Sequence, residues 1–169
     1  SLVGSEMCIR DRNKRIHFMS AMTALGKKDG DNSSGGIGYL DIAAFIRANG
    51  ANPEKDLIEL WKRIVFNIAV SNTDDHLRNH GFILTENGWR LSPVYDVNPN
   101  LDKDALSLNV TEEDNALSVD LAIEVCEKFG IDKKDAVELA KGVLVTVCDN
   151  WRIIAEKNGL SKSSIEYMK

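Results

Sequence analysis

A long amphipathic segment in the middle of the chain constrains the fold more than any other feature. It begins near Pro53, and apolar residues recur along it every three or four positions, which is the spacing of one broad helical face. These residues are Leu57, Leu60, Trp61, Ile64, Val65 and Ile68. Pro53 and the acidic residues Glu54 and Asp56 are typical of the first turn of a helix. The segment therefore predicts a central core helix.

The rest of the chain indicates more helices and little sheet. Helical periods are found at Lys14–Leu25, Tyr39–Ala48, Ala116–Phe129 and Lys134 to about Asn158. The last of these has one apolar stripe, comprising Ala136, Ala140, Val143, Leu144, Val147, Trp151 and Ile154. Short β-prone runs on both sides of Asn87-Gly88 predict a hairpin. A length of 169 residues suits one domain, so the expected fold class is mainly α with a small β-hairpin.

Composition excludes several classes of protein. Lys and Arg number 21 against 26 Asp and Glu, and no dense basic block is present, which disfavours direct nucleic-acid binding. No apolar run approaches the roughly 18–20 residues of a membrane span, so no membrane association is expected. The cysteines, Cys8, Cys126 and Cys148, are odd in number and widely spaced. This spacing favours reduced thiols and a cytoplasmic location over disulfides or a zinc site.

The first twelve residues, SLVGSEMCIRDR, do not fit the pattern of the rest. They have neither the architecture of a signal peptide nor a clean helical or strand period. The string resembles the translated read-through of a sequencing adapter, which would make residues 1–12 a non-native leader with upstream protein missing. A natural disordered terminus is the alternative. On either interpretation, the domain comprises residues 13–169.

An unusually polar block follows the central helix. Residues 72–79, NTDDHLRN, stand between an apolar helix and an apolar strand, where a plain turn needs only Gly or Asn. Asp96 follows the hairpin, seventeen residues after Asn79. In protein kinases an Asp receives the proton of the substrate hydroxyl, and a later Asn and Asp hold Mg²⁺ on the phosphates. Asp74, Asn79 and Asp96 have this order, and their oxygen atoms are ligands that Mg²⁺ accepts.

The stretch from Arg15 to Asn100, above all NTDDHLRNHGF and GWRLSPVYDVNP, resembles the carboxy-terminal lobe of the HipA family. These are serine/threonine kinase toxins of bacterial type II toxin–antitoxin systems. The resemblance implies a phosphatidylinositol-kinase-like variant of the kinase fold, ATP and Mg²⁺ as cofactors, and Asp74 as the catalytic base. It further implies Asn79 and Asp96 as the Mg²⁺ ligands. The residues that it places against the nucleotide are His76, Arg78, Asn79, Tyr95 and Asp96.

The resemblance also implies partners. They are a small helix-turn-helix antitoxin, through which operator DNA is reached indirectly, and a protein phosphorylated on serine, such as an aminoacyl-tRNA synthetase. The sequence contains no glycine-rich phosphate loop followed by a strand lysine. We therefore expect the amino-terminal lobe of the kinase to be missing from this chain, and the fragment alone to be a poor enzyme.

One position departs from the ordinary kinase pattern, and two other functions stay open. His76 replaces the lysine that usually follows the base by two residues, as it does in the HipA family, and Arg78 is a candidate for the missing positive charge. One alternative function is a catalytically inactive kinase-like interaction module. The other is a metal-dependent hydrolase that uses Asp74, Asp75, His76 and Asp96. A zinc pair of His76 and His80 would need a helix, and Gly81 with the strand after it argues against one.

Overall fold

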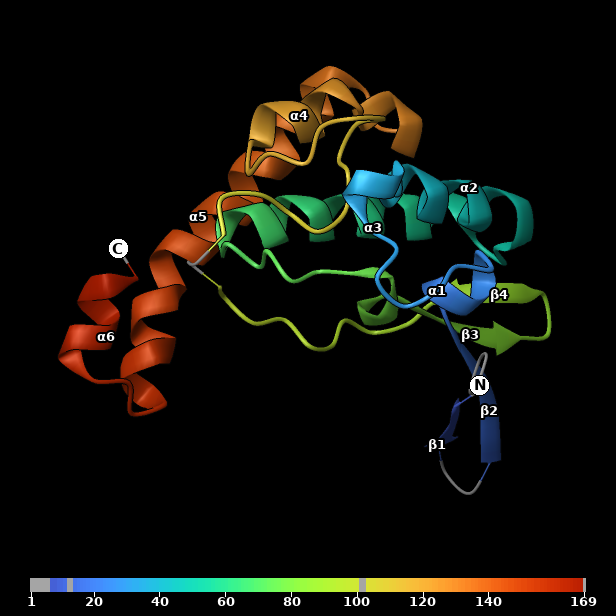
Figure 1. The fold of residues 1–169 in the computed structure, drawn as a ribbon, viewed down its shortest axis with the longest axis horizontal. Coiled ribbons are helices and arrows are strands. Elements are labelled where there is room, and N and C mark those ends of the chain that lie inside the picture. The colour runs from blue at the N-terminus through green and yellow to red at the C-terminus, as the bar shows by residue number, and fades with distance from the viewer. Residues whose placement is uncertain (1–6, 12–13, 101–102, 169) are drawn as a thin grey trace.

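The computed structural model describes residues 7–11, 14–100 and 103–168, with side chains from residue 16 onward (Figure 1). Its α-helices are α1 (Ala21–Ala24), α2 (Tyr39–Asn49), α3 (Pro53–Ala69), α4 (Val119–Glu124), α5 (Lys133–Lys157) and α6 (Lys162–Tyr167). Three short 3₁₀ helices, η1 (Ser33–Gly35), η2 (Leu77–Asn79) and η3 (Cys126–Phe129), complete the helical part. The mainly helical class is confirmed. No helix among the described residues is both long and apolar enough to cross a membrane.

The sheet is larger than the single hairpin that the sequence predicts. It is antiparallel with the strand order β1-β2-β3-β4. The strands are β1 (Met7–Asp11), β2 (Lys14–Ser20), β3 (Gly81–Thr85) and β4 (Gly88–Leu91). The hairpin β3–β4 is confirmed, with Gly88 at a φ of 124°, a conformation that glycine adopts without steric cost.

The helix expected over Lys14–Leu25 is wrong, because Lys14–Ser20 forms β2 and only Ala21–Ala24 is helical. Apolar residues three apart fit a helix, but Phe18 is buried next to the exposed His17, which is the alternation of a strand. Phe18 pairs with Ile83 of β3. Gly81 makes room for the Phe18 ring, since a Cβ there would lie 2.2 Å from its Cζ. Pairing with β3 therefore decides the conformation of this segment.

Part of the expected leader also has regular structure. Met7–Asp11 forms β1 and pairs with β2, with Ile9 opposite Ile16. The expectation of a segment without strand structure is therefore wrong for these five residues. The foreign origin of residues 1–12 stays a prediction. Among the cysteines, Cys126 and Cys148 are free thiols, and the side chain of Cys8 lies outside the described residues.

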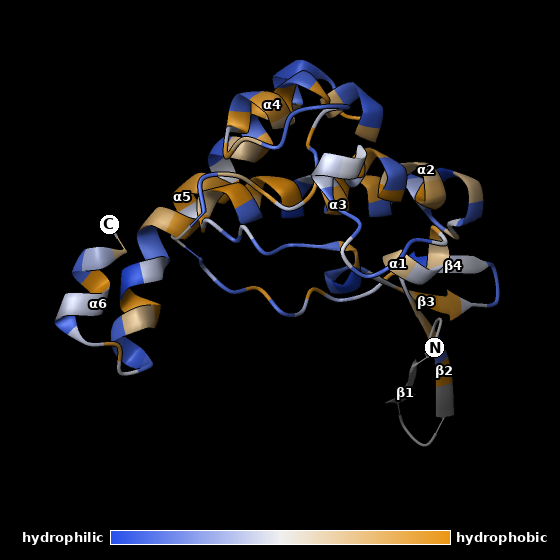
Figure 2. Cartoon of the chain, viewed as in Figure 1, coloured by the Kyte–Doolittle hydropathy of each residue, from blue (hydrophilic) through white to orange (hydrophobic). Residues whose placement is uncertain are grey.

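Helix α3 lies at the centre of the hydrophobic core, as the sequence predicts. It packs against α2 and α5, and apolar residues concentrate along these helices (Figure 2). Leu60, Trp61, Ile64 and Val65 are completely buried. The Trp61 indole Nε1 donates a hydrogen bond to the Ala122 carbonyl oxygen at 2.7 Å, so the largest core side chain also satisfies its polar atom.

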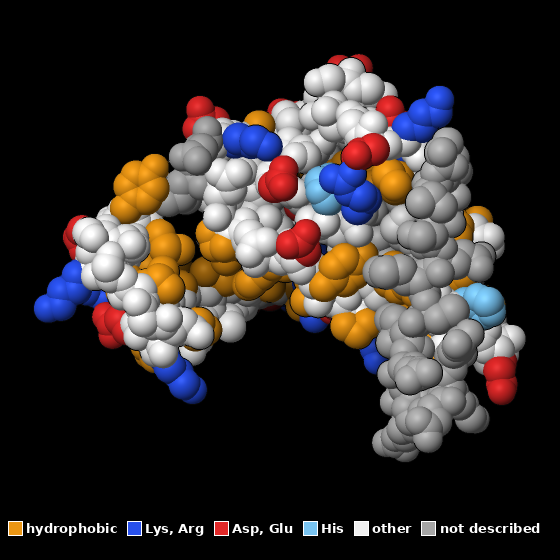
Figure 3. All heavy atoms as spheres, turned by 60° about the horizontal axis from the view of Figure 1, so that its bottom comes forward, with side chains coloured by type: hydrophobic (Ala, Val, Ile, Leu, Met, Phe, Trp, Pro, Cys, Tyr) orange, Lys and Arg blue, Asp and Glu red, His pale blue; other side chains and the backbone are white. Residues whose placement is uncertain are grey.

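The apolar stripe of α5 contributes less to the core than its sequence suggests. Ala136 and Ala140 are buried, whereas Ile154 is 56% exposed. The carboxy-terminal half of α5 extends from the body of the molecule and folds back through α6 (Figure 1). In a space-filling view, hydrophobic side chains gather in the hollow between these helices and the body (Figure 3). The periodicity correctly predicts a helix, but not how much of it other elements cover.

An ion pair with a buried aspartate attaches the hairpin to the start of α3. Asp56 is 3% exposed, and its carboxylate accepts hydrogen bonds from Arg90 Nε at 2.8 Å and Arg90 Nη2 at 2.9 Å. The backbone nitrogen of Leu91 donates a third, at 3.0 Å. Asp56 therefore does more than complement the helix dipole, because it also fixes β4 against α3.

A second buried carboxylate, that of Asp75, fixes the loop between α3 and β3. Its Oδ2 accepts hydrogen bonds from Tyr39 Oη at 2.7 Å, Asn67 Nδ2 at 2.7 Å and His80 Nε2 at 2.8 Å. Asn67 in turn accepts a bond from Asn72 Nδ2 through its Oδ1, at 3.1 Å. The donors to Asp75 come from α2, α3 and the residue before β3. We call Asp75 with Tyr39, Asn67 and His80 the Asp75 hub.

The hub shifts the acid–base properties of its members. Burial alone raises the pKa of Asp75, but the charge and hydrogen bond of His80, with the hydroxyl of Tyr39, outweigh it and lower that pKa. Burial first, and then the negative charge of Asp75, raise the pKa of Tyr39 well above its usual value. Asp75 is therefore a stable carboxylate and Tyr39 a stable neutral donor at neutral pH.

The Asp56 ion pair yields a first prediction. Asp56→Ala removes both guanidinium contacts and leaves the Leu91 N–H without its acceptor, so we expect a loss of about 2–3 kcal/mol in the free energy of unfolding. Asp120→Ala is the matched control, since this exposed residue also lies in the first turn of a helix. It should cost about 0.5 kcal/mol or less. Urea denaturation followed by circular dichroism measures both, and equal losses would contradict the special role of Asp56.

The Asp75 hub predicts a specific dependence of stability on pH. Because folding lowers the pKa of Asp75, its contribution is complete above the unfolded pKa of about 3.9 and is lost as the pH falls through the folded pKa. Asp75→Asn should cost about 3 kcal/mol at pH 7 and flatten the decline in unfolding free energy below about pH 4. Asp104→Asn, at an exposed loop residue, is the control. If the unfolding free energies of Asp75→Asn and wild type declined in parallel as the pH falls, the hub would not control the stability of the protein in acid.

Candidate functional site

The loop from Val70 to His80 carries most of the residues that the sequence singles out. It begins with Ser71 at a φ of 52°, and the Asn72 backbone nitrogen bonds back to the Asn67 carbonyl oxygen at 2.8 Å. The chain thereby reverses at the end of α3. Asp75 then points inward to the hub, whereas the side chain of its neighbour Asp74 is 61% exposed. The two adjacent carboxylates thus have opposite environments.

Asn79 brings the three predicted site residues together. Its side-chain nitrogen Nδ2 lies 3.4 Å from the backbone oxygen of Asp74 and 3.5 Å from the backbone oxygen of Asp96. Asn79 itself is 7% exposed. The amide nitrogen faces these two carbonyls. Residues before and after the hairpin therefore meet at Asn79.

Asp96 has an unusual backbone conformation. Its φ is 55°, in the left-handed region that Asp tolerates better than most residues but rarely occupies. Asn98 Nδ2 donates a hydrogen bond to Asp96 Oδ1 at 2.9 Å, and the residue is exposed. Such conformations persist where surrounding structure enforces them, and they are frequent at functional sites.

The donor atoms fit a magnesium ion better than zinc. An amide oxygen from Asn79 and a carboxylate from Asp96 are hard oxygen ligands, and Mg²⁺ keeps several waters besides such protein ligands. Within the described ranges, no group of three or more His, Cys, Asp or Glu residues is arranged to hold a metal. His80 is committed to Asp75 and His76 to Arg78. The pairing of His76 with His80 as zinc ligands is therefore not supported.

Tyr95, in the segment after the hairpin, contacts the loop that carries Arg78. Its hydroxyl donates to the backbone oxygen of Arg78 at 2.7 Å, and its ring packs edge-on against Phe18 with centroids 6.1 Å apart. Burial, more than any neighbouring charge, raises the pKa of Tyr95 to about 12. The hydroxyl is thus a neutral donor that holds the Arg78 backbone.

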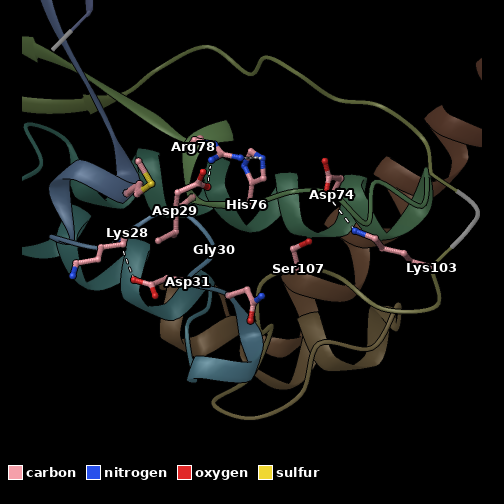
Figure 4. A pocket seen from close by; sticks show the side chains of 12 residues that line it. Lys28, Asp29, Gly30, Asp31, Asp74, His76, Arg78, Lys103 and Ser107 are labelled. Atoms are coloured by element: carbon pink, nitrogen blue, oxygen red, sulfur yellow. Dashed lines mark hydrogen bonds and ion pairs between the residues drawn. The ribbon is translucent and has the colours of Figure 1, made fainter. Parts of the chain in front are cut away.

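A pocket of about 220 Å³ opens beside Asp74 (Figure 4). Asp74, His76 and Arg78 lie along one side of it, and the loop of residues 27–38 contributes the other. The remaining lining residues are Met22, Lys28, Asp29, Gly30, Asp31, Asn32, Leu77, Lys103 and Ser107. Asn79, Tyr95 and Asp96 do not line it. The pocket therefore contains the predicted base and two of the residues predicted to contact nucleotide.

His76 contacts Arg78 through one of its ring nitrogens. Arg78 Nη2 lies 3.1 Å from His76 Nε2. The other ring nitrogen, Nδ1, is buried without a hydrogen-bond partner in the described part of the chain. Arg78 Nη1 also pairs with Asp29 from the loop opposite. Arg78 is thus held between His76 and Asp29.

Two pocket residues were missed by the sequence analysis. Asp29 pairs with Arg78, and Lys103 Nζ lies 3.4 Å from Asp74 Oδ1. Both contacts are visible in Figure 4. Each residue stands in a polar loop with no motif around it, so no sequence signal distinguishes it from a solvated surface charge.

A scan against protein families identifies the HipA-like C-terminal domain over residues 9–151. The protein named "Putative kinase Y4mE" from Sinorhizobium fredii is 31% identical over 85 residues, which are 49% of this chain and 20% of that protein. The protein named "Putative kinase" from Haemophilus influenzae is 35% identical over 107 residues, 58% of this chain and 31% of that protein. The chain thus matches less than a third of the length of either relative.

A solved structure has the same fold. It is that of the Shewanella oneidensis MR-1 toxin–antitoxin system, HipA with HipB and operator DNA. The TM-score is 0.65 at 16% sequence identity, and the alignment covers 100% of this chain and 41% of the matched one. With the family match over residues 9–151, these likenesses show that the chain belongs to the family of HipA-like C-terminal domains.

Proposed function

We propose that this chain is the catalytic carboxy-terminal part of a kinase that transfers the γ-phosphoryl group of ATP to a serine or threonine hydroxyl of a protein. The observation that carries the proposal is the position of Asn79, whose side-chain nitrogen lies within 3.5 Å of the backbone oxygens of both Asp74 and Asp96. The order of these residues is that of a kinase base and its two metal ligands. The likeness to two proteins named as putative kinases supports the same class.

Each residue has a distinct role in this proposal. The exposed Asp74 carboxylate accepts the proton of the attacking hydroxyl. Asn79 Oδ1 and the Asp96 carboxylate hold Mg²⁺, which when bound neutralises charge on the phosphates. His76 and Arg78 contact the nucleotide beside the pocket, while Tyr95 acts indirectly by fixing the backbone of Arg78.

The buried position of Asp75 favours a kinase over a metal-dependent hydrolase. The hydrolase alternative requires Asp75 together with Asp74 as metal ligands, but the Asp75 Oδ2 atom accepts three hydrogen bonds inside the protein. Withdrawing it would leave the donors of the hub unpaired, which is costly for buried groups. Asp75 is therefore a structural residue in this proposal.

Partners follow from the relatives and are part of the proposal. The HipA of Shewanella oneidensis was solved with HipB and operator DNA. We propose that this chain likewise belongs to a toxin–antitoxin pair, with an antitoxin that provides the contacts to DNA. The net charge of −5 agrees with DNA contact through a partner rather than directly.

The division of roles between Asp74 and Asp96 is testable in a fusion protein, in which the amino-terminal part of the Haemophilus influenzae relative precedes this whole chain. Asp74→Asn should lower phosphoryl transfer by about 10³-fold or more and leave Mg–ATP affinity nearly unchanged, because it removes a base but no metal ligand. Asp96→Ala should weaken Mg–ATP binding itself. Transfer is measured with γ-labelled ATP and a serine-containing acceptor, and affinity by calorimetry.

The control for these variants is Asp120→Asn, at an exposed residue of α4. It should behave as wild type in both measurements. Equal Mg–ATP affinity in wild type and Asp96→Ala at limiting Mg²⁺ would contradict the role of Asp96. Unaltered transfer by Asp74→Asn would contradict the kinase proposal as a whole.

A further prediction concerns the chain by itself. Phosphoryl transfer depends on positioning and on charge around the γ-phosphate, to which both lobes of a kinase contribute. The chain alone should therefore transfer phosphate at least about 100-fold more slowly than the fusion protein. Both proteins are assayed at the same Mg–ATP concentration. Comparable rates would show that the described domain already contains a complete site.

A further inference from the structure

The loop that carries the proposed base has no lysine at the position two residues after it. That position is His76, whose Nε2 lies 3.1 Å from Arg78 Nη2. Developing charge on a transferred phosphoryl group needs cations or strong donors placed in advance. Arg78, in the same loop, and Lys103, from the segment after the hairpin, both line the pocket beside Asp74.

Arg78 is poorly placed to meet the requirement. Its guanidinium pairs with Asp29 and His76, and its backbone oxygen accepts from Tyr95. These contacts hold Arg78 toward the loop of residues 27–38, on the far side of His76 from Asp74 (Figure 4). Arg78 is thus engaged away from the base.

Lys103 reaches Asp74 from the segment after the hairpin. Its Nζ lies 3.4 Å from Asp74 Oδ1, with side chains 53% and 61% exposed. A pair this exposed contributes little to folding stability. Folding stability therefore does not explain why Lys103 lies beside the proposed base.

The backbone on both sides of Lys103 is tied to the loop that carries Asp74. Before Lys103, the Asn100 backbone nitrogen donates to the Ser71 oxygen at 2.9 Å, and Thr73 Oγ1 donates to the Asn100 oxygen at 3.1 Å. After it, Ser107 Oγ donates to the Thr73 oxygen at 2.8 Å. Asn100 and Ser107, which lie on either side of Lys103 in the sequence, are therefore both held against residues 71–73.

We propose that Lys103 is a catalytic residue that contacts the transferred phosphoryl group and supplies the positive charge that Arg78, paired with Asp29 and His76, does not bring to Asp74. This inference rests on the proposed kinase function. The acceptor hydroxyl oxygen bonds to the γ-phosphorus, the bond from that phosphorus to the bridging oxygen breaks with its electrons going to ADP, and Asp74 takes the hydroxyl proton. Lys103 stays protonated throughout. Its ammonium has three N–H donors, enough for Asp74 and a phosphoryl oxygen together.

The test compares Lys103→Met, Lys103→Arg and Arg78→Met in the fusion protein, with Lys141→Met as a matched control. Lys141 is an exposed lysine paired with Glu138 on α5, away from the pocket. Lys103→Met should lower kcat about 100-fold with the KM for ATP within about twofold, because the contact is made in the transition state. Lys103→Arg should recover most of the loss, and Lys141→Met should match wild type. The loss in Arg78→Met should appear mainly in KM.

A binding measurement provides a readout besides activity. Mg–ADP with aluminium fluoride mimics the transferring phosphoryl group, and Lys103→Met should weaken its binding by a factor similar to the loss in kcat. Binding of Mg–ADP alone should be unchanged. Because Lys103 is exposed, the variant should keep the unfolding midpoint of wild type, which separates a lost contact from a lost fold.

The outcomes distinguish the inference from the proposed function. A wild-type rate in Lys103→Met would overturn the role of Lys103, and a rise in rate would overturn it by showing that Lys103 blocks the base. Unchanged affinity for the aluminium fluoride complex would also overturn it. If wild-type fusion protein transferred no phosphate and Asp74→Asn behaved identically, the kinase function would fail instead.

Discussion

A single buried carboxylate, that of Asp75, organises the segments on which the candidate site depends. Its Oδ2 accepts hydrogen bonds from Tyr39 on α2, Asn67 on α3 and His80 before β3. A buried charge is costly unless its surroundings compensate for it. Any arrangement that moves one of these elements away leaves the carboxylate and a donor unsatisfied. The loop between α3 and β3 consequently has one strongly preferred conformation, and the α2–α3 core and the sheet are joined through it.

The position of the site follows from this constraint. With Asp75 held inward, its neighbour Asp74 lies on the opposite side of the chain and is exposed. Asn79, a few residues further on, is held where its side chain reaches the backbone of Asp74 and of Asp96. The hairpin is fixed separately, through Arg90 and Asp56. Two buried carboxylates thus place the two halves of the motif relative to each other, while Asp74 and Asp96 themselves are exposed.

The failures of sequence interpretation have specific physical causes. Residues 14–20 contain apolar residues at both helical and strand spacings, and pairing of Phe18 and Met19 with β3 decides for the strand. The stripe on α5 correctly predicts a helix, yet Ile154 is largely exposed, because periodicity does not reveal what packs against a face. The hydrolase alternative counts Asp75 among its metal-binding residues, whereas the structure buries that carboxylate among three hydrogen-bond donors.

The sequence by itself determined the core helix α3, the hairpin and the order of Asp74, Asn79 and Asp96, because these depend on neighbours within a few residues or on a local motif. Only the tertiary structure decided which partners surround that motif. Tyr39 is 36 positions from Asp75, and Lys103 is 29 from Asp74. Such contacts form when separate elements pack together, and no local propensity encodes them. For that reason the residues of the motif were identified from sequence, whereas the hub that holds it and the lysine beside its base were not.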